Sequence, residues 1–308
     1  MNIEDFIPQD CTALDLVRWG TSRFNEAEIF FGHGTDNAVD EALVLVRHGL
    51  HLPPDIPTEL LRGRLTRKEK QTILKLFSRR VAERIPAAYL TREAWFAGLR
   101  LYVDERVLIP RSPIAEWIER GFAPWMEDTD GVRRILDLGT GSGCLAIAAA
   151  LAFPESHVDA VDISSDAIDV ARQNIRDHGV DDRIRVIESD LFAATVLEGP
   201  YDIILSNPPY VDAEEIAAMP PEYHHEPRIG LAAGTDGLAC VTPIVRDAVR
   251  FLAPKGILVI EVGTSRLALE RTFPELSLVW LALESGGENV FLVTAEDLRN
   301  ALDGFISC

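Results

Sequence analysis

Four consecutive residues, Asn207, Pro208, Pro209 and Tyr210, form the most chemically suggestive stretch of this chain. An apolar run at 203–205 precedes them, so we expect them at the open end of a buried strand. Two consecutive prolines hold φ near about −65° and donate no backbone hydrogen bonds, which leaves stiff carbonyls free to accept. An amide side chain, free carbonyls and an aromatic ring together suit the binding of a planar NH2 group.

A glycine-rich loop and two aspartates follow other apolar runs. Residues 139–143 carry glycine at every second position, and Cys144 stands where a dinucleotide fingerprint has its third glycine. Asp162 ends the next expected strand, at a spacing that suits ribose hydroxyls. Asp190 follows the third strand and could accept a hydrogen bond from an adenine amino group. An adenosine ligand with no phosphate-binding lysine nearby points to S-adenosylmethionine.

The elements that must position these residues alternate between strands and helices. The pattern predicts strands at 134–138, 157–163, 184–188, 201–206 and 257–262, and helices at 144–153, 165–179 and 242–252. For the helix at 165–179, Ser165 is the expected N-cap and Gly179 the expected C′ residue. Apolar runs at 276–283 and 289–294 flank a turn-rich loop and predict a hairpin. This order predicts a mostly parallel, doubly wound sheet with an antiparallel end, whose ligands bind where the strand order reverses.

The first part of the chain predicts a small helical bundle. Apolar spacing predicts helices at 10–20, 25–31, 38–50 and 66–85, with Thr66 and Glu69 as a capping box for the last. A hairpin at 95–103, an extended stretch at 108–113 and a helix at 114–125 should follow. We therefore expect a helical substrate-recognition domain at 1–92, a hairpin and linker at 93–113 and the sheet domain at 114–308.

Composition limits the possible classes of protein. The chain has 308 residues and 47% apolar content, and its longest apolar run, 145–153, is far shorter than the roughly 20 residues of a membrane span. Its first residues lack the features of a signal peptide, so we expect a soluble, cytoplasmic protein. Four scattered cysteines without CxxC spacing, and histidines without HxxxH spacing, predict neither a disulfide framework nor a metal site.

Charge is unevenly distributed along the chain. The net charge is −19, and residues 135–308 hold 11 Lys and Arg against 28 Asp and Glu. Such an acidic half would repel bare nucleic acid and attract a basic protein, or it could serve only solubility. A basic stretch at 62–84 could contact RNA or an acidic partner, or be a solvated helix face.

These motifs together resemble a known family. Residues 137–143, Asp162, Asp190 and the tetrapeptide resemble amino-methyltransferases that use S-adenosylmethionine on planar nitrogens. The helical piece, the hairpin, residues 108–111, 226–227 and 234–238 narrow the resemblance to protein-(glutamine-N(5)) methyltransferases, over nearly the whole chain. The resemblance implies an α/β fold with a seven-stranded, mostly parallel Rossmann-like sheet, a C-terminal antiparallel hairpin and a small N-terminal helical bundle.

Two further segments distinguish branches within that family. Release-factor enzymes carry P-R-P-[DE]-[ST]-E where this chain has Pro-Arg-Ser-Pro-Ile-Ala-Glu at 110–116. That version, with residues 31–37 (Phe-Gly-His-Gly-Thr-Asp-Asn) and 40–42, is similar to the branch that modifies a large-subunit ribosomal protein, L-three. The resemblance therefore implies a basic protein substrate, free or in an assembling particle.

The resemblance also implies roles for individual residues. The Asn207 side-chain oxygen and the Pro208 carbonyl would accept both N–H bonds of a glutamine amide, drawing its lone pair towards the methyl group. Tyr210 would lie against the flat amide, and water could take the released proton. The implied donor-binding residues are Asp137, Gly139, Thr140, Gly141, Gly143, Asp162, Ile163, Asp190, Leu191 and Asn207. The implied substrate-binding residues are Asn207, Pro208, Pro209, Tyr210 and Tyr102, of which Tyr102 could equally be a core aromatic of the hairpin.

Other interpretations remain open. A release-factor methyltransferase and a nucleic-acid adenine-N(6) methyltransferase both face the same planar NH2 problem. A non-catalytic adenosine-binding assembly protein could keep the fold without transferring a methyl group. His224 and His225 follow two prolines, so we expect surface or loop-packing roles for them rather than acid–base chemistry.

Overall fold

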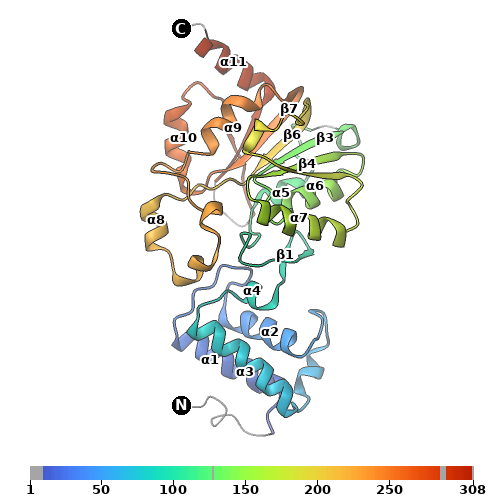
Figure 1. Cartoon of the computed structure of the whole chain (residues 1–308), viewed down its shortest axis with the longest axis vertical. Coiled ribbons are helices and arrows are strands. Elements are labelled where there is room, and N and C mark those ends of the chain that lie inside the picture. Colours follow the sequence, from blue (N-terminus) through green and yellow to red (C-terminus); the bar gives the residue numbers. More distant parts are fainter. Residues whose placement is uncertain (1–9, 127, 285–288, 307–308) are drawn as a thin grey trace. The chain divides into compact units, whose positions relative to one another are not determined.

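The computed structural model of the chain describes residues 10–126, 128–284 and 289–306 (Figure 1). The predicted turn residues 285–288 and the first nine residues, which include the expected start without a signal peptide, lie outside the described part. The chain divides into two compact units. We call the first, residues up to Ala94 with Pro220–His225, the helical unit; the second, Trp95–Met219 with the residues from Glu226 on, is the sheet unit.

The helical unit contains α1 (Ala13–Glu26), α2 (Ala38–Gly49), α3 (Arg67–Ala82), α4 (Ala87–Thr91), and the 3-10 turns η2 (Thr58–Arg62) and η5 (Pro221–His225). The predicted capping box of α3 is confirmed, because Thr66 and Glu69 bond each other's backbone N–H groups. The predicted helix at 25–31 is wrong: α1 ends at Glu26, and Glu28 has a left-handed φ of 50°. Its neighbouring carbonyls accept hydrogen bonds from Arg84 instead of continuing a helix.

Phe77 of α3 joins the main helices of this unit. Its ring lies edge-on to Phe24, 5.3 Å between centroids, and a side chain at Gly20 would come within 2.6 Å of it. α1 and α3 can therefore approach closely only because residue 20 is a glycine. Leu16, Leu45 and Ile73 are fully buried around this contact region, so the unit has its own apolar core.

The sheet unit holds the predicted seven-stranded sheet. Its strands are β3 (Arg134–Leu138), β4 (His157–Asp162), β5 (Ile184–Glu188), β6 (Tyr201–Ser206), β7 (Leu252–Glu261), β8 (Val279–Trp280) and β9 (Val290–Thr294). They lie in the order β5-β4-β3-β6-β7-β9-β8. β3 to β7 are parallel, while β9 is antiparallel to both β7 and β8. The predicted fold class, including the C-terminal antiparallel hairpin, is confirmed.

Helices cover both faces of this sheet (Figure 1). Ile135, Ile203 and Ile257 point to the face covered by α5 (Ile114–Glu119), α6 (Cys144–Ala152) and α7 (Ser165–Asp177). Their chain neighbours point to the face covered by α9 (Val241–Ala248), α10 (Arg266–Thr272) and α11 (Ala295–Ile306). This alternation is the two-residue period of strands that are buried on both faces.

The remaining elements connect the sheet and its helices. They are β1 (Ala94–Phe96) and β2 (Leu99–Leu101), which form the predicted hairpin, α8 (Ala213–Ala218), and the 3-10 turns η3 (Thr129–Gly131), η4 (Leu191–Ala193), η6 (Arg228–Gly230) and η7 (Gly263–Ser265).

Several predicted boundaries need correction. The helix expected at 114–125 ends at Glu119, and the strand expected at 276–283 is only Val279–Trp280. Ser164, rather than Ser165, caps α7, because its hydroxyl accepts the Ala167 N–H. Gly179 does occupy the left-handed position after that helix, with φ of 64°.

The basic stretch at 62–84 splits into two parts. Five of its cations are exposed: Arg62, Arg64, Arg67, Lys68 and Lys75. Arg80 is fully buried and Arg84 is bonded to backbone carbonyls, so neither contributes an open cationic surface.

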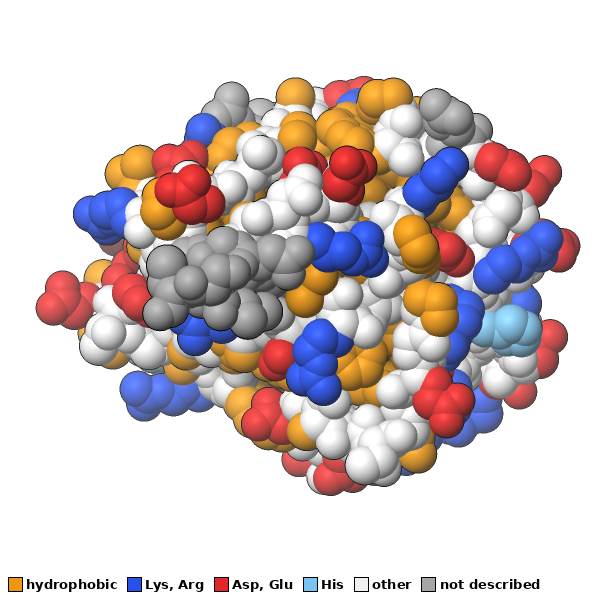
Figure 2. Space-filling model, turned by 90° about the horizontal axis from the view of Figure 1, so that it is seen from above, with side chains coloured by type: hydrophobic (Ala, Val, Ile, Leu, Met, Phe, Trp, Pro, Cys, Tyr) orange, Lys and Arg blue, Asp and Glu red, His pale blue; other side chains and the backbone are white. Residues whose placement is uncertain are grey.

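On the face of the molecule shown in Figure 2, acidic, basic and apolar side chains are interspersed rather than gathered by sign.

Within the described ranges, no helix is long and apolar enough to cross a bilayer. The same ranges contain no cluster of three or more His, Cys, Asp and Glu side chains arranged to hold a metal ion.

Candidate functional site

The predicted site residues meet where the strand order reverses. Chain order runs outward from β3 to β4 and β5 on one side, and from β6 to β7 on the other. Leu138 pairs with Val161 on β4 and with Ser206 on β6. The glycine loop that follows Leu138 and the tetrapeptide that follows Ser206 therefore leave adjacent strands at the same level. Doubly wound sheets bind their ligands at this edge.

The glycine loop is tightly turned and open above its backbone. Gly139 and Gly141 have φ values of 74° and 55°, a region that side chains other than glycine rarely adopt. A Cβ atom built on either would meet nothing within 4 Å. The N–H groups of Gly139 and Thr140 both donate to the Val161 carbonyl, which holds the loop against β4. The loop thus presents bare backbone to open space.

Asp137 lies beneath this loop and is fully buried. Its Oδ2 accepts the Thr140 hydroxyl at 2.6 Å, while Oδ1 makes no hydrogen bond with any described residue. Burial, together with the nearby Asp162 charge, raises the pKa of Asp137 to about 7 although the Thr140 hydroxyl opposes the shift. A buried acceptor without a partner at the edge of a ligand crevice is available to a cationic or N–H-bearing ligand.

Asp162 ends β4 and faces the same loop. Its two carboxylate oxygens accept the N–H groups of Gly141 and Ser164, at 2.8 and 2.9 Å. Burial raises its pKa, although these backbone hydrogen bonds act in the opposite direction. Ile163 follows with 53% of its surface exposed, which leaves an apolar side chain uncovered beside the carboxylate.

Asp190 and Leu191 lie one strand further out. Ser189 donates its N–H to the Asp162 carbonyl, so the end of β5 is fixed beside the end of β4. Asp190 is exposed and precedes the short turn η4. Leu191 has a left-handed φ of 46°, an uncommon conformation for leucine that concentrates at functional sites.

The first half of the tetrapeptide offers unused acceptors. Ser206 is buried and donates its hydroxyl to the Leu138 carbonyl at 2.7 Å, which fixes the start of the turn. Neither the Asn207 side chain nor the Pro208 carbonyl has a hydrogen-bond partner in the part of the chain that the structure describes. Asn207 is half-buried and Pro208 is buried. Two oxygen acceptors beside the glycine loop are therefore available to an N–H-bearing substrate.

The second half of the tetrapeptide is clamped. The Tyr210 hydroxyl donates to Glu261 Oε1 at 2.9 Å. Its ring lies against Gly263, where a Cβ would come within 2.4 Å of a ring carbon, and its backbone carbonyl lies against Gly237. Both glycines are needed because any side chain there would displace the tyrosine.

Glu261, at the end of β7, connects Tyr210 with the linker before α5. Its second oxygen accepts the Ser112 hydroxyl at 2.7 Å. Burial raises the pKa of Glu261, while the hydrogen bonds from Ser112 and Tyr210 and the charge of Arg111 act against that shift. Ser112 belongs to the Ser-Pro-Ile version of the linker that distinguishes this chain from the release-factor pattern, so one carboxyl group joins that serine to the tetrapeptide.

Tyr102 is attached to the glycine loop through Asn174 of α7. The buried Asn174 side chain bonds both the N–H and the carbonyl of Tyr102, and also donates to the Ser142 carbonyl at 2.8 Å. The Tyr102 hydroxyl donates to Asp104. Although burial opposes it, the hydrogen bonds of Arg106 and Tyr102 hold the pKa of Asp104 at about 2. Tyr102 is half-buried, which places it beside the predicted donor loop without making it a core residue.

The histidines after the tetrapeptide do not join this site. His224 is exposed, and His225 belongs to the helical unit, where its Nε2 donates to the Glu83 carbonyl. Glu226 returns to the sheet unit, where its two oxygens bind Arg111 at 2.6 and 2.7 Å. Both histidines therefore have the surface or loop-packing character that the sequence predicted.

Sequence reasoning missed Glu261 and Asn174 as parts of the site. Glu261 ends β7, which the sequence predicted only in part, as 257–262 instead of 252–261, and its position next to the turn at Gly263 was a usable signal. Asn174 had none, because its role depends on the packing of α7 against a hairpin more than 70 residues away.

The chain matches known proteins of one chemical class. Residues 122–220 match the family model described as a methyltransferase small domain. This match and the seven-stranded sheet agree with a methyltransferase that has a Rossmann-like fold, the class to which the relatives below also belong. A looser likeness is the crystal structure of a methyltransferase from Pyrococcus furiosus, at 19% identity over 64% of this chain and 89% of that chain, with a TM-score of 0.46.

Full-length relatives narrow the class. The ribosomal protein uL3 glutamine methyltransferase of Neisseria gonorrhoeae is 50% identical over 93% of this chain and 95% of its own length. That of Bordetella pertussis is 49% identical over 94% of this chain and 96% of its own length. The chain belongs to the family of ribosomal protein uL3 glutamine methyltransferases, as its branch-specific segments predicted.

Proposed function

We propose that this protein transfers a methyl group from S-adenosylmethionine to the side-chain amide nitrogen of a glutamine in ribosomal protein uL3. The single observation that carries the proposal is the pair of unpartnered acceptors on Asn207 and Pro208, held one strand away from the open glycine loop. Relatives of nearly the same length, named for this activity, support the choice of substrate.

The residues of the crevice fit the proposed donor. Asp162 and Asp190 would hold the ribose and the adenine amino group, and the exposed Ile163 would lie against the adenine ring. The unpartnered Oδ1 of Asp137 would attract the donor's ammonium group. The bare backbone at 139–141 leaves room for the methionine part of the donor. When bound, S-adenosylmethionine supplies a methyl group already activated by a sulfonium.

The acceptor site must then overcome the weak nucleophilicity of an amide nitrogen, whose lone pair is delocalised into its carbonyl. Asn207 and Pro208 would accept its two N–H bonds, orient its lone pair and stabilise positive charge as it develops. Pro209 would keep that geometry stiff, and Tyr210, with Tyr102, would bound the flat amide. The nitrogen gains a carbon and loses one proton, which water can accept. Alignment of the reacting atoms is the main task left to the protein.

The helical unit is the proposed substrate-recognition part, and a ribosomal protein substrate supports the proposal that the protein acts in the cytoplasm. The acidic half of the chain suits a basic substrate.

Substitution of Asn207 tests the proposal. We expect Asn207→Ala to keep the donor dissociation constant within about threefold while lowering the single-turnover rate about 100-fold or more, as for loss of one oriented group at a reacting centre. The assay offers labelled donor with purified uL3, large ribosomal subunits, release factor, or adenine-containing oligonucleotides. Equal turnover by the variant, or transfer only to release factor or nucleic acid, would reject the assignment.

A further inference from the structure

The loop that follows the tetrapeptide contains six residues, Pro220–His225, that belong to the helical unit and not to the sheet unit. Residues 211–219 belong to the sheet unit, Pro220–His225 to the helical unit, and the chain returns at Glu226. The loop therefore begins at the proposed methyl-acceptor site, enters the other unit and comes back. This connection is covalent, so it holds whatever the arrangement of the units.

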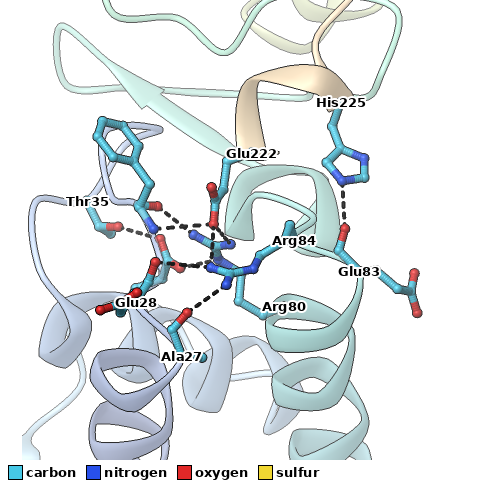
Figure 3. Close-up of polar contacts among 10 residues, drawn as sticks. Ala27, Glu28, Thr35, Arg80, Glu83, Arg84, Glu222 and His225 are labelled. Atoms are coloured by element: carbon cyan, nitrogen blue, oxygen red, sulfur yellow. Dashed lines mark hydrogen bonds and ion pairs between the residues drawn. The ribbon is translucent and has the colours of Figure 1, made fainter. Parts of the chain in front are cut away.

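Among residues 220–225, Glu222 is the most buried, and its side chain is inaccessible to solvent (Figure 3). Its Oε1 accepts from Arg80 Nη1 at 3.1 Å, from Arg84 Nη1 at 3.4 Å and from the Phe30 N–H at 3.3 Å. Burial alone would raise the pKa of Glu222, but its backbone and Arg80 hydrogen bonds hold it below the ordinary value. Glu222 is therefore ionised inside the helical unit.

Arg80, the receiving residue, is equally buried. It binds Glu41 through Nε and the Phe30 carbonyl through Nη2 at 2.8 Å (Figure 3). Glu41 also accepts the Thr35 hydroxyl at 2.7 Å. Two carboxylates and two guanidinium groups thus balance their charges in this interior, and Glu222 is the one member that the loop brings in. If one of the two carboxylates is lost, one positive charge of this group is no longer balanced.

Neighbours of Glu222 reinforce the contact. The Tyr223 ring lies 4.5 Å from the His33 ring, between centroids, and His225 Nε2 donates to the Glu83 carbonyl. His33 and Thr35 belong to the segment 31–37 that marks this branch of the family. That segment therefore helps to form the receptor for the loop.

α8 itself is only weakly held to the sheet unit, through an exposed hydrogen bond that Glu215 accepts from the Thr264 hydroxyl at 3.1 Å. None of the residues of α8, Ala213–Ala218, is buried. On its N-terminal side, Val211 is bonded to Leu231 and Ala233 in the sheet unit. On its C-terminal side, the next firmly buried residue is Glu222. A short exposed helix attached at both ends samples fewer positions than one attached at a single end.

We propose that residues 220–225 anchor the substrate loop in the helical unit, with Glu222 as a positioning residue for protein substrate binding. This inference rests on the proposed function, since the loop begins at the tetrapeptide. The tetrapeptide is clamped separately by Glu261 and Gly263. Loss of the anchor should therefore weaken binding of uL3, whose association would have to order the loop, and leave the chemical step intact.

The test compares Glu222→Gln with Glu41→Gln. Both changes remove one carboxylate from Arg80, but only the first releases the loop. We expect both variants to lose thermal stability, while Glu222→Gln alone raises the KM for uL3 roughly tenfold with kcat and donor affinity within about twofold of wild type. Limited proteolysis should cut 211–219 faster in Glu222→Gln than in wild type, and no faster in Glu41→Gln. His225→Ala, a half-buried change, should shift both readouts in the same direction by less.

An unchanged KM and unchanged cleavage in Glu222→Gln would overturn the proposal, as would equal effects of Glu41→Gln. Proteolysis reports on the anchor without any catalysis. A wild-type protein that transfers no methyl group to uL3, yet shows the expected cleavage pattern, would therefore refute the proposed substrate and leave the anchor standing.

Discussion

The Tyr210–Glu261 hydrogen bond yields the most specific prediction for catalysis. We expect Glu261→Gln to lower kcat for uL3 methylation about fivefold. The variant keeps an oxygen near the Tyr210 hydroxyl, now 2.9 Å from the carboxylate, but makes the acceptor neutral. A hydrogen bond to a charged group contributes roughly 1 kcal/mol more than one between neutral groups. If that difference holds the ring in its productive position, it corresponds to about fivefold in rate.

A double-mutant cycle with Tyr210→Phe measures the contribution of the Tyr210–Glu261 hydrogen bond to kcat directly. Because Glu261 should act through the tyrosine hydroxyl, Glu261→Gln should have no further effect on kcat in the Tyr210→Phe background. Ser112→Ala is the matched control, since it removes a hydrogen bond to the other oxygen of Glu261 and leaves both atoms of the Tyr210–Glu261 hydrogen bond in place. We expect the control to keep kcat within about twofold. Additive losses in the double variant would refute the reasoning.

Stability should respond in the opposite sense to activity. Burial raises the pKa of Glu261 above its ordinary value of 4.5, so Glu261 binds a proton more tightly in the folded protein than in the unfolded chain. Its contribution to stability is full below pH 4.5 and is lost as pH rises through the folded pKa. Gln does not titrate. The Tm of Glu261→Gln relative to wild type should therefore increase with pH above that value, and a falling difference would contradict the burial argument.

Two further predictions concern ligands. Because the pKa of Asp137 is raised to about 7, deprotonation above that pH should strengthen binding of the cationic donor, and Asp137→Asn should remove most of this pH dependence in titration calorimetry. If the donor affinity of Asp137→Asn still increased with pH as in wild type, Asp137 would be excluded as the group responsible for the pH dependence. We also propose that the exposed cations of the basic stretch contact ribosomal RNA. Changing Arg67, Lys68 and Lys75 together to Gln should reduce methylation of uL3 bound to RNA, and its salt dependence, without affecting free uL3. Lys255→Gln, an exposed change in the sheet unit, is the control, and equal activity of the triple variant on both substrates would count against RNA contact.

Much of the sheet was predictable because its signals are local. Strands 134–138, 184–188 and 201–206 were predicted to the residue, since buried parallel strands are short apolar runs bounded by turn residues. The order of those strands then determined which loops share an edge. Asp162 and Asn207 could be assigned to one crevice for that reason alone, before any distance was known.

Contacts between distant segments were not predictable. The strand-end position of Glu261 could suggest a site residue, but its two partners, Tyr210, 51 positions earlier, and Ser112, could not be read from the sequence. The extra helix predicted at 25–31 failed for a related reason. Its apolar spacing was helical, but Arg84 takes the carbonyls of Ala27 and Glu28 that another turn would have used.

The loop after the tetrapeptide combines both kinds of information. Its start is set by local chemistry, because Pro208 and Pro209 force the chain out of the sheet wherever they occur. Its continuation is set by two buried glutamates that no local rule distinguishes: Glu222 binds Arg80 in the helical unit, and Glu226, four residues on, binds Arg111 in the sheet unit. These two ion pairs hold neighbouring parts of one short segment in different units. They therefore determine where the loop leaves the sheet unit and where it returns to it. A mutation that changes the relative strengths of the Glu222–Arg80 and Glu226–Arg111 ion pairs should therefore change the KM for uL3 before it changes the kcat of methyl transfer.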